Sequence, residues 1–193
     1  MALRIFEVRY LDLIKRCQRE QQAFGVVLLH QGREVQQAGV TETLGAWGCT
    51  AHLESVEELQ PALLQVQCRG GQRFELLAAE RGAYGRWRGQ IRLLPPDPVL
   101  DLPLDLQFMA DQLGRLIADA QGRGMASMLP IRPPYRLDEA GWVANRWAEL
   151  WPLAVPFKEH LLATDDPLAR LRMLAQVFKA SEPGSSDRHP PGA

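Results

Sequence analysis

Apolar side chains in the first 17 residues recur at helical spacing. They fall at offsets of 0, 4, 7, 8 and 11, which places them on one face of a helix. Gly25 ends this pattern, and the aliphatic run Val26–Leu29 that follows is typical of a buried strand. The pattern therefore predicts a helix over residues 5–17 and then a strand. The helical positions are Phe6, Tyr10, Leu13, Ile14 and Cys17.

Between about residues 35 and 94 the pattern changes to short strands separated by glycine. The dipeptide Gly70-Gly71 lies between two of them and predicts a hairpin turn. Several short strands with turn signals between them favour a small barrel or sandwich. The candidate strands are Gly45–Leu53, Ala62–Cys68, Phe74–Ala79 and Arg86–Leu94.

The last of these strands alternates between two kinds of side chain, which predicts one solvent face and one core face. Arg86, Arg88 and Arg92 form a basic face, and Trp87 falls on the other side. We interpret the basic face as solvated. Two functional alternatives stay open, an acidic peptide or partner and an RNA-binding face, although an RNA stacking platform needs its aromatic groups on the basic face.

Helical periodicity returns after the proline-rich stretch 95–98, which we take as a boundary. Asp138 is expected to cap a later helix, and Asp166 followed by Pro167 predicts another helix start. The chain thus divides into a barrel subdomain with an N-terminal helix (1–95), a helical subdomain (96–180) and a disordered tail (181–193). The first helical stripe consists of Leu106, Met109, Ala110, Leu113, Ile117 and Ala120.

The loop Gly124–Leu137 carries more apolar side chains than a solvated connector needs. Methionine is adaptable and recurs at binding surfaces that accept many partners. Two interpretations stay open: the loop fills the junction between barrel and helices, or it forms a peptide-binding lip. The candidate lip residues are Met125, Met128, Leu129, Ile131 and Tyr135.

Composition excludes several classes of protein. The 22 basic and 23 acidic side chains give a net charge of −1, which argues against a surface built for nucleic acid or an anionic membrane. Three cysteines without zinc-ligand spacing indicate buried thiols in a reducing compartment. The N-terminal residues form neither a signal peptide nor a membrane span, so we expect a soluble, cytoplasmic protein.

No motif for catalysis or metal binding is present. The chain lacks a Walker A sequence, a Gly-x-Ser-x-Gly elbow and a Ser-x-x-Lys pair, and its four histidines lie at no ligand spacing. We therefore expect no catalytic residue, no metal and no cofactor.

Three stretches, taken in order, resemble the substrate-binding N-terminal domain of Lon proteases. Each alone is mostly a core pattern, but their order and spacing together make the resemblance specific. It covers residues 3–178. The stretches are LRIFEVRYLDLIKRC (Leu3–Cys17) with FGVVLL (Phe24–Leu29), LLQVQCRGGQRFELL (Leu63–Leu77), and the helical segment Val143–Phe178.

This resemblance implies an α+β protein, a PUA-like β-barrel followed by a small helical bundle. It also implies a non-catalytic module that binds unfolded or degron-bearing polypeptides, as an adaptor in proteolysis or quality control. A protease or chaperone partner is left open, and neither nucleic acid nor membrane is expected. The chain departs from the family in two ways. The strand that normally precedes the first helix is expected to be missing or lost to a misassigned start, and the ATPase and peptidase domains are absent.

Overall fold

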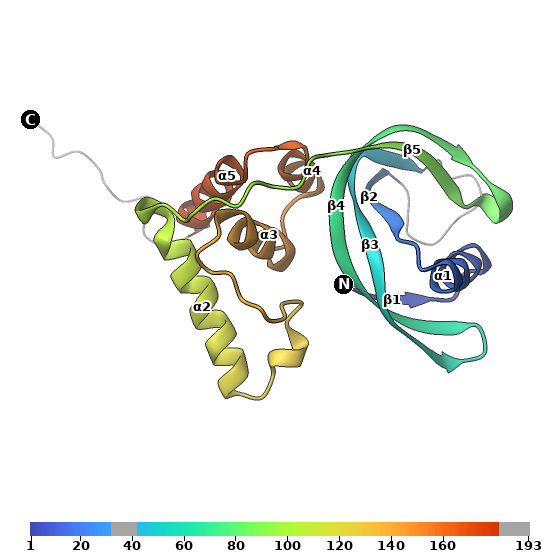
Figure 1. Cartoon of the computed structure of the whole chain (residues 1–193), viewed down its shortest axis with the longest axis horizontal. Coiled ribbons are helices and arrows are strands. Elements are labelled where there is room, and N and C mark those ends of the chain that lie inside the picture. The colour runs from blue at the N-terminus through green and yellow to red at the C-terminus, as the bar shows by residue number, and fades with distance from the viewer. Residues whose placement is uncertain (32–41, 182–193) are drawn as a thin grey trace, which may run out of the picture. The chain divides into compact units, whose positions relative to one another are not determined.

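The computed structural model describes residues 1–31 and 42–181, in two compact units (Figure 1). The first unit comprises Met1–Pro96 with Ala154–Ala163, and the second comprises Asp97–Leu153 with the chain from Thr164 onward. The single boundary drawn from the sequence at residue 95 thus differs from the division in the structure, because the chain returns once to the first unit. The predicted disordered tail lies outside the described residues from position 182.

The first unit is built on a five-stranded antiparallel sheet in which β4 is the central strand. The strand order is β1-β4-β3-β2, and β5 also pairs with β4. Helix α1 (Val8–Glu20) lies on the concave side of this curved sheet (Figure 1). Together with the five α-helices found in the two units over residues 1–31 and 42–181, the sheet confirms the α+β class. The strands are β1 (Ala2–Ile5), β2 (Phe24–Gln31), β3 (Thr43–Gln60), β4 (Leu63–Arg81) and β5 (Trp87–Leu93).

Strand β1 corrects the expectation that the chain starts directly on a helix. Ala2–Ile5 pairs antiparallel with Leu64–Gln67 of β4, and Met1 and Cys68 exchange backbone hydrogen bonds of 2.9 and 2.8 Å. The helix begins only at Val8. The prediction of a missing strand was wrong because four residues are too few for a period of 2 to stand out beside a helical stripe.

The expected turn at Gly70-Gly71 is also corrected, because both glycines lie inside β4. A Cβ atom at Gly71 would lie 2.5 Å from the Thr50 hydroxyl oxygen of β3, so the close approach of the strands requires glycine. The register shifts here, and the Gln72 N–H donates to that hydroxyl at 2.9 Å. The chain turns instead between β3 and β4, where Ala62 has φ of 63°.

The core of the first unit lies between α1 and the sheet. Its fully buried members are joined by partly buried Leu3, Leu11 and Phe24. Elsewhere in the sheet, a Cβ atom at Gly48 would lie 2.5 Å from the buried Phe74 ring, so glycine makes room for this ring. The buried cluster consists of Ile14, Ala51, Leu64, Val66 and Cys68.

Helix α4 (Val155–Ala163) belongs to the sheet unit because polar contacts fix it to β2, β3 and β4. The Glu159 carboxylate accepts from the Ala46 N–H at 2.7 Å and lies 2.6 Å from Nε2 of His30. The Arg73 guanidinium donates to the carbonyl of Leu162 at 2.5 Å. These contacts explain why the sequence pattern alone, which shows only a short helix, did not assign α4 to the sheet.

The second unit is helical, and its first helix confirms the predicted stripe. Buried side chains from Met109 to Ala120 line one face of α2, and Trp147 on α3 donates through its indole N–H to the carbonyl of Met109 at 3.0 Å. One prediction about α3 was wrong: Asp138 does not cap it, because the Ala140 N–H donates to the carbonyl of Leu100 instead. The helices are α2 (Gln107–Gly122), α3 (Ala140–Leu150) and α5 (Pro167–Ser181), with 3₁₀ turns at Leu104–Leu106 (η2) and Ala126–Met128 (η3).

Helix α5 starts as its sequence predicts. Pro167 is its first residue, and the Asp166 carboxylate accepts from the Leu168 N–H at 2.9 Å. The buried Arg170 donates to the Asn145 side chain at 3.0 Å and pairs with Asp97. This polar contact ties α5 to α3 and to the start of the second unit.

Candidate binding surfaces

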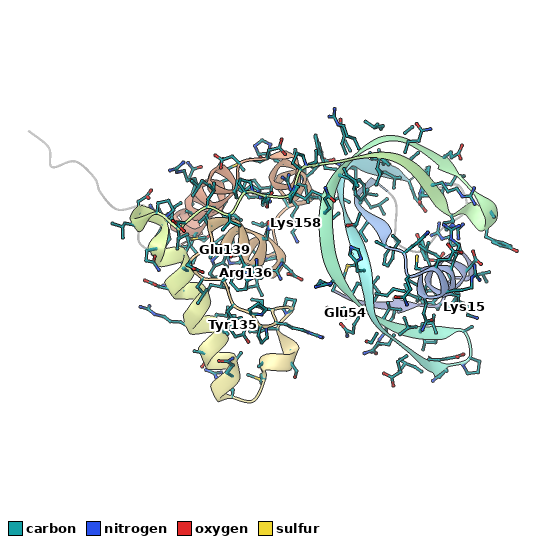
Figure 2. The ribbon with its side chains drawn as sticks, viewed as in Figure 1. Lys15, Glu54, Tyr135, Arg136, Glu139 and Lys158 are labelled. Carbon is teal, nitrogen blue, oxygen red and sulfur yellow. The ribbon has the colours of Figure 1, made fainter. Side chains whose placement is uncertain are left out.

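The structure separates the residues of the predicted lip. Met125 and Met128 are 40% and 78% exposed, whereas Ile131 is 3% exposed and lies in the core of the helical unit. Leu129 is partly buried. Tyr135, which is labelled in Figure 2, packs edge-on against Trp142. Its hydroxyl oxygen accepts a hydrogen bond from the Gln121 amide at 3.2 Å. Only the two methionines therefore present large apolar surface.

A shallow hollow of about 390 Å³ lies on the helical unit beside the same segment. Five of its lining residues come from α2, and Leu137 at the end of the segment closes one side. Its lining mixes polar and apolar groups. The α2 residues are Gln107, Ala110, Asp111, Gly114 and Arg115.

The basic face predicted on β5 is not a uniform solvated surface. Arg86 is only 7% exposed, and its guanidinium lies 2.8 Å from the Asp12 carboxylate of α1. Arg92 pairs with Glu75 of β4, and Arg88 is exposed. The interpretation of Arg86 as solvated was wrong because its partner lies 74 residues away in the sequence. With one arginine buried and another paired, the geometry does not favour phosphate binding at this face.

The paired strands β4 and β5 carry exposed apolar side chains that the sequence analysis missed. Leu77, Ile91 and Leu93 are 57%, 41% and 51% exposed, and they lie on the paired strands β4 and β5. Leu77 sits at a register shift between Leu76 and Ala78, where β4 has one more residue than β5. We call these three residues the ribbon patch. The alternation of β5 placed Ile91 and Leu93 together on a face expected to be buried. The structure instead leaves both side chains exposed.

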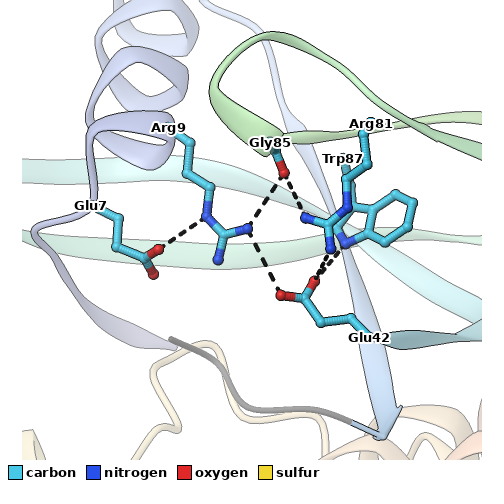
Figure 3. Close-up of polar contacts among 6 residues, drawn as sticks. All are labelled: Glu7, Arg9, Glu42, Arg81, Gly85 and Trp87. Carbon is cyan, nitrogen blue, oxygen red and sulfur yellow. Dashed lines mark hydrogen bonds and ion pairs between the residues drawn. The ribbon is translucent and has the colours of Figure 1, made fainter. Parts of the chain in front are cut away.

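A buried polar cluster holds the turn between β4 and β5 in place (Figure 3). The Glu42 carboxylate accepts from the Trp87 indole at 2.8 Å and from Arg81 at 3.0 Å, and it lies 3.9 Å from Arg9 of α1. Arg81 stacks over the Trp87 ring at 4.0 Å from its centroid. The carbonyl of Gly85 in turn accepts from Arg81 at 2.7 Å and from Arg9 at 3.4 Å. We call it the Glu42 cluster; it holds the turn end of the two strands that carry the apolar patch.

The three thiols are free, and burial raises the pKa of Cys17, Cys49 and Cys68. A raised pKa keeps these groups protonated at neutral pH, which makes them poor nucleophiles and poor metal ligands. Within residues 1–31 and 42–181, no three His, Cys, Asp or Glu side chains are grouped as metal ligands. The same part of the chain has no helix of the length and apolarity that crossing a membrane requires.

The sequence and the fold were compared with those of known proteins. The model of the ATP-dependent protease La (LON) substrate-binding domain matches residues 1–179. A Lon N-terminal domain protein from Xanthomonas campestris is 28% identical and superposes with a TM-score of 0.68, over 95% of this chain and 89% of that one. The N-terminal domain of a Mycobacterium avium complex Lon protease, 16% identical, shares the fold with a TM-score of 0.56, over 94% and 91%. No curated protein matches the chain.

Proposed function

Since the chain belongs to the family of ATP-dependent protease La (LON) substrate-binding domains, we propose that it binds unfolded or degron-bearing polypeptides without acting on them chemically. In this proposal its sheet unit is a PUA-like barrel, and the protein serves as a cytoplasmic adaptor that presents polypeptides to proteolysis or quality control. The ligands implied by a protease substrate-binding domain are proteins, and this supports polypeptides as the class of partner.

The ribbon patch is the observation that carries the proposal. Leu77, Ile91 and Leu93 expose apolar surface on one pair of strands, whose connecting turn is held by the Glu42 cluster. Exposed apolar side chains gathered at one place favour a binding surface, whereas single exposed residues need no explanation. Such a surface suits unfolded chains, because these expose apolar side chains that folded proteins bury.

The methionines of the predicted lip offer a second contact on the helical unit. Met125 precedes the short turn η3 and Met128 is its last residue, and the flexible thioether side chains of both are exposed. We propose that they contact the same class of ligand. Ile131, which is buried, and Tyr135, which packs on Trp142, support the loop from inside.

The test is binding of a fluorescently labelled, reduced and carboxymethylated α-lactalbumin, a chain that stays unfolded. The triple variant Leu77→Thr/Ile91→Thr/Leu93→Thr should bind at least about tenfold more weakly, because burial of each side chain contributes about 1 kcal/mol or more. Threonine keeps the strand propensity, and exposed sites shift stability by about 0.5 kcal/mol or less, so the variant should stay folded.

A matched control removes exposed apolar side chains elsewhere. The double variant Val99→Thr/Leu104→Thr changes residues that are also strongly exposed but lie in the helical unit. It should bind like the wild type. The proposal fails if the triple variant binds α-lactalbumin as tightly as the wild type does. It also fails if the wild type loses binding when the salt concentration is raised from low to moderate, because such a loss is typical of electrostatic binding to phosphates.

A further inference from the structure

The second half of β3 pairs with a strand along one edge only. Strand β2 pairs with β3 no further than Ala51, and no other strand in the described ranges 1–31 and 42–181 extends the sheet beyond His52. Within this half, Ser55–Glu58 keeps a regular one-to-one register with β4. The unpaired N–H and C=O groups of such an edge are a template for another extended chain.

The opposite edge of the same β4 segment shows how short an added strand can be. Leu64–Gln67 pairs with Ser55–Glu58 on one side and with the four-residue β1 on the other. Each β4 residue therefore stands at the centre of a three-strand row. A segment added to β3 would extend these rows and would face Ser55, Val56, Glu57 and Glu58 in turn.

The free edge is acidic. No lysine or arginine occurs from His52 to Gln60, and the stretch carries three glutamates, of which Glu54 is labelled in Figure 2. Glu54 lies 4.0 Å from Arg69 of β4. Glu57 and Glu58 are exposed and form no ion pair with any residue that the structure describes. An added strand with acidic side chains at these rows would be repelled, and a basic one would be attracted.

We propose that the β3 edge Ser55–Glu58 captures extended basic segments by strand addition. Val56, which packs on the core below, would face an apolar side chain, and Glu57 and Glu58 would face lysine or arginine. For an antiparallel addition the ligand therefore reads basic, basic, apolar from its N-terminus. The inference rests on the proposed polypeptide-binding function and names the segment of the polypeptide that this surface selects.

The experiment measures fluorescence anisotropy of two labelled octapeptides that differ in two residues. One carries Lys-Lys-Val in a threonine-rich background, and its twin carries Glu-Glu-Val. The wild-type chain should bind the basic peptide about tenfold more tightly than the acidic one, because two cross-strand charge pairs change sign. The variant Glu57→Lys/Glu58→Lys should reverse this preference.

Two controls separate strand addition from general electrostatic attraction. The variant Asp105→Lys/Asp138→Lys makes the same change of net charge at exposed positions of the helical unit, and it should keep the preference of the wild type. A basic peptide methylated at alternate backbone nitrogens keeps its charges but cannot complete the ladder, and it should lose binding. Hydrogen exchange should slow at Ser55–Glu58 when the unmethylated peptide binds.

The outcomes distinguish this inference from the function on which it rests. It is overturned if the preference survives the Glu57→Lys/Glu58→Lys change, if methylation has no effect, or if protection appears elsewhere. It is also overturned if neither peptide binds while unfolded α-lactalbumin still binds through the ribbon patch, in which case polypeptide binding stands. If neither the peptides nor α-lactalbumin bind, both proposals fail.

Discussion

Glu42 contacts side chains from three elements of the sheet unit, α1, β4 and β5. Its carboxylate is 7% exposed and contacts Arg81, Arg9 and Trp87. We predict that Glu42→Gln lowers the free energy of unfolding by about 1–3 kcal/mol, because it weakens the hydrogen bonds that the carboxylate accepts from Arg81 and Trp87. Buried Arg9 keeps its nearer carboxylate, Glu7 at 3.1 Å. Urea denaturation measures the change.

The matched control for this prediction is Glu75→Gln, which removes a carboxylate whose partner Arg92 is largely exposed. Its effect should stay below about 1 kcal/mol. Equal stability of Glu42→Gln and the wild type would contradict the role assigned to the cluster in Figure 3.

The buried thiols predict how stability depends on pH. Burial raises the pKa of Cys17 and Cys68 in the folded state, so the folded protein holds these protons more tightly than the unfolded chain does. Their contribution is complete below the unfolded thiol pKa of about 8.5 and is lost as the pH rises above it. Unfolding in urea at pH 7 and at pH 9.5 should therefore show lower stability at the higher pH. The variant Cys17→Ala/Cys68→Ala should show a smaller loss, and equal losses in the two proteins would contradict the prediction.

At the scale of elements, the segment between α2 and α3 has an exposed part and a buried part. Met125→Ser/Met128→Ser should weaken binding of unfolded α-lactalbumin with little change in melting temperature, because both side chains are exposed. Ile131→Ser should instead cost about 2–5 kcal/mol of stability, because it places a polar group in the core. Thermal unfolding and anisotropy, measured on each variant, separate the two effects.

The conservative variant Ile131→Val serves as the control for the buried position. It should lose about 0.5–1.5 kcal/mol and bind normally per folded molecule. A marked fall in melting temperature for the methionine variant, with binding intact, would mean that the whole segment is a structural plug.

At the scale of the whole molecule, the chain combines a family of substrate-binding domains with a sequence that lacks catalytic motifs. We predict that the purified 193-residue chain neither hydrolyses ATP nor cleaves casein. It has no P-loop to hold the phosphates and no Ser-x-x-Lys pair to supply a nucleophile. Phosphate release and casein proteolysis assays test this, with protein from a mock purification as the control. Turnover above that control would contradict the prediction.

Features that depend on neighbours along the chain could be predicted from the sequence. The stripe from Met109 to Ala120 matches the buried face of α2, and Asp166 with Pro167 starts α5 as predicted. The order and spacing of three stretches were sufficient to indicate the family. These signals succeed because helical periodicity and capping involve residues within four positions of one another.

Which residues are buried and which are exposed depends on long-range packing, which the sequence pattern does not report. Gly70-Gly71 has the composition of a turn, yet the close approach of Thr50 makes it part of a strand. Arg86 has the pattern of a solvent face, yet Asp12 of α1 holds it in the interior. Local alternation reports two faces of a strand but not what covers each face, because the covering groups are distant in sequence. Such long-range packing explains the exposure of the ribbon patch and the free edge of β3. It also explains why Met128 is exposed while Ile131, three residues later, is buried.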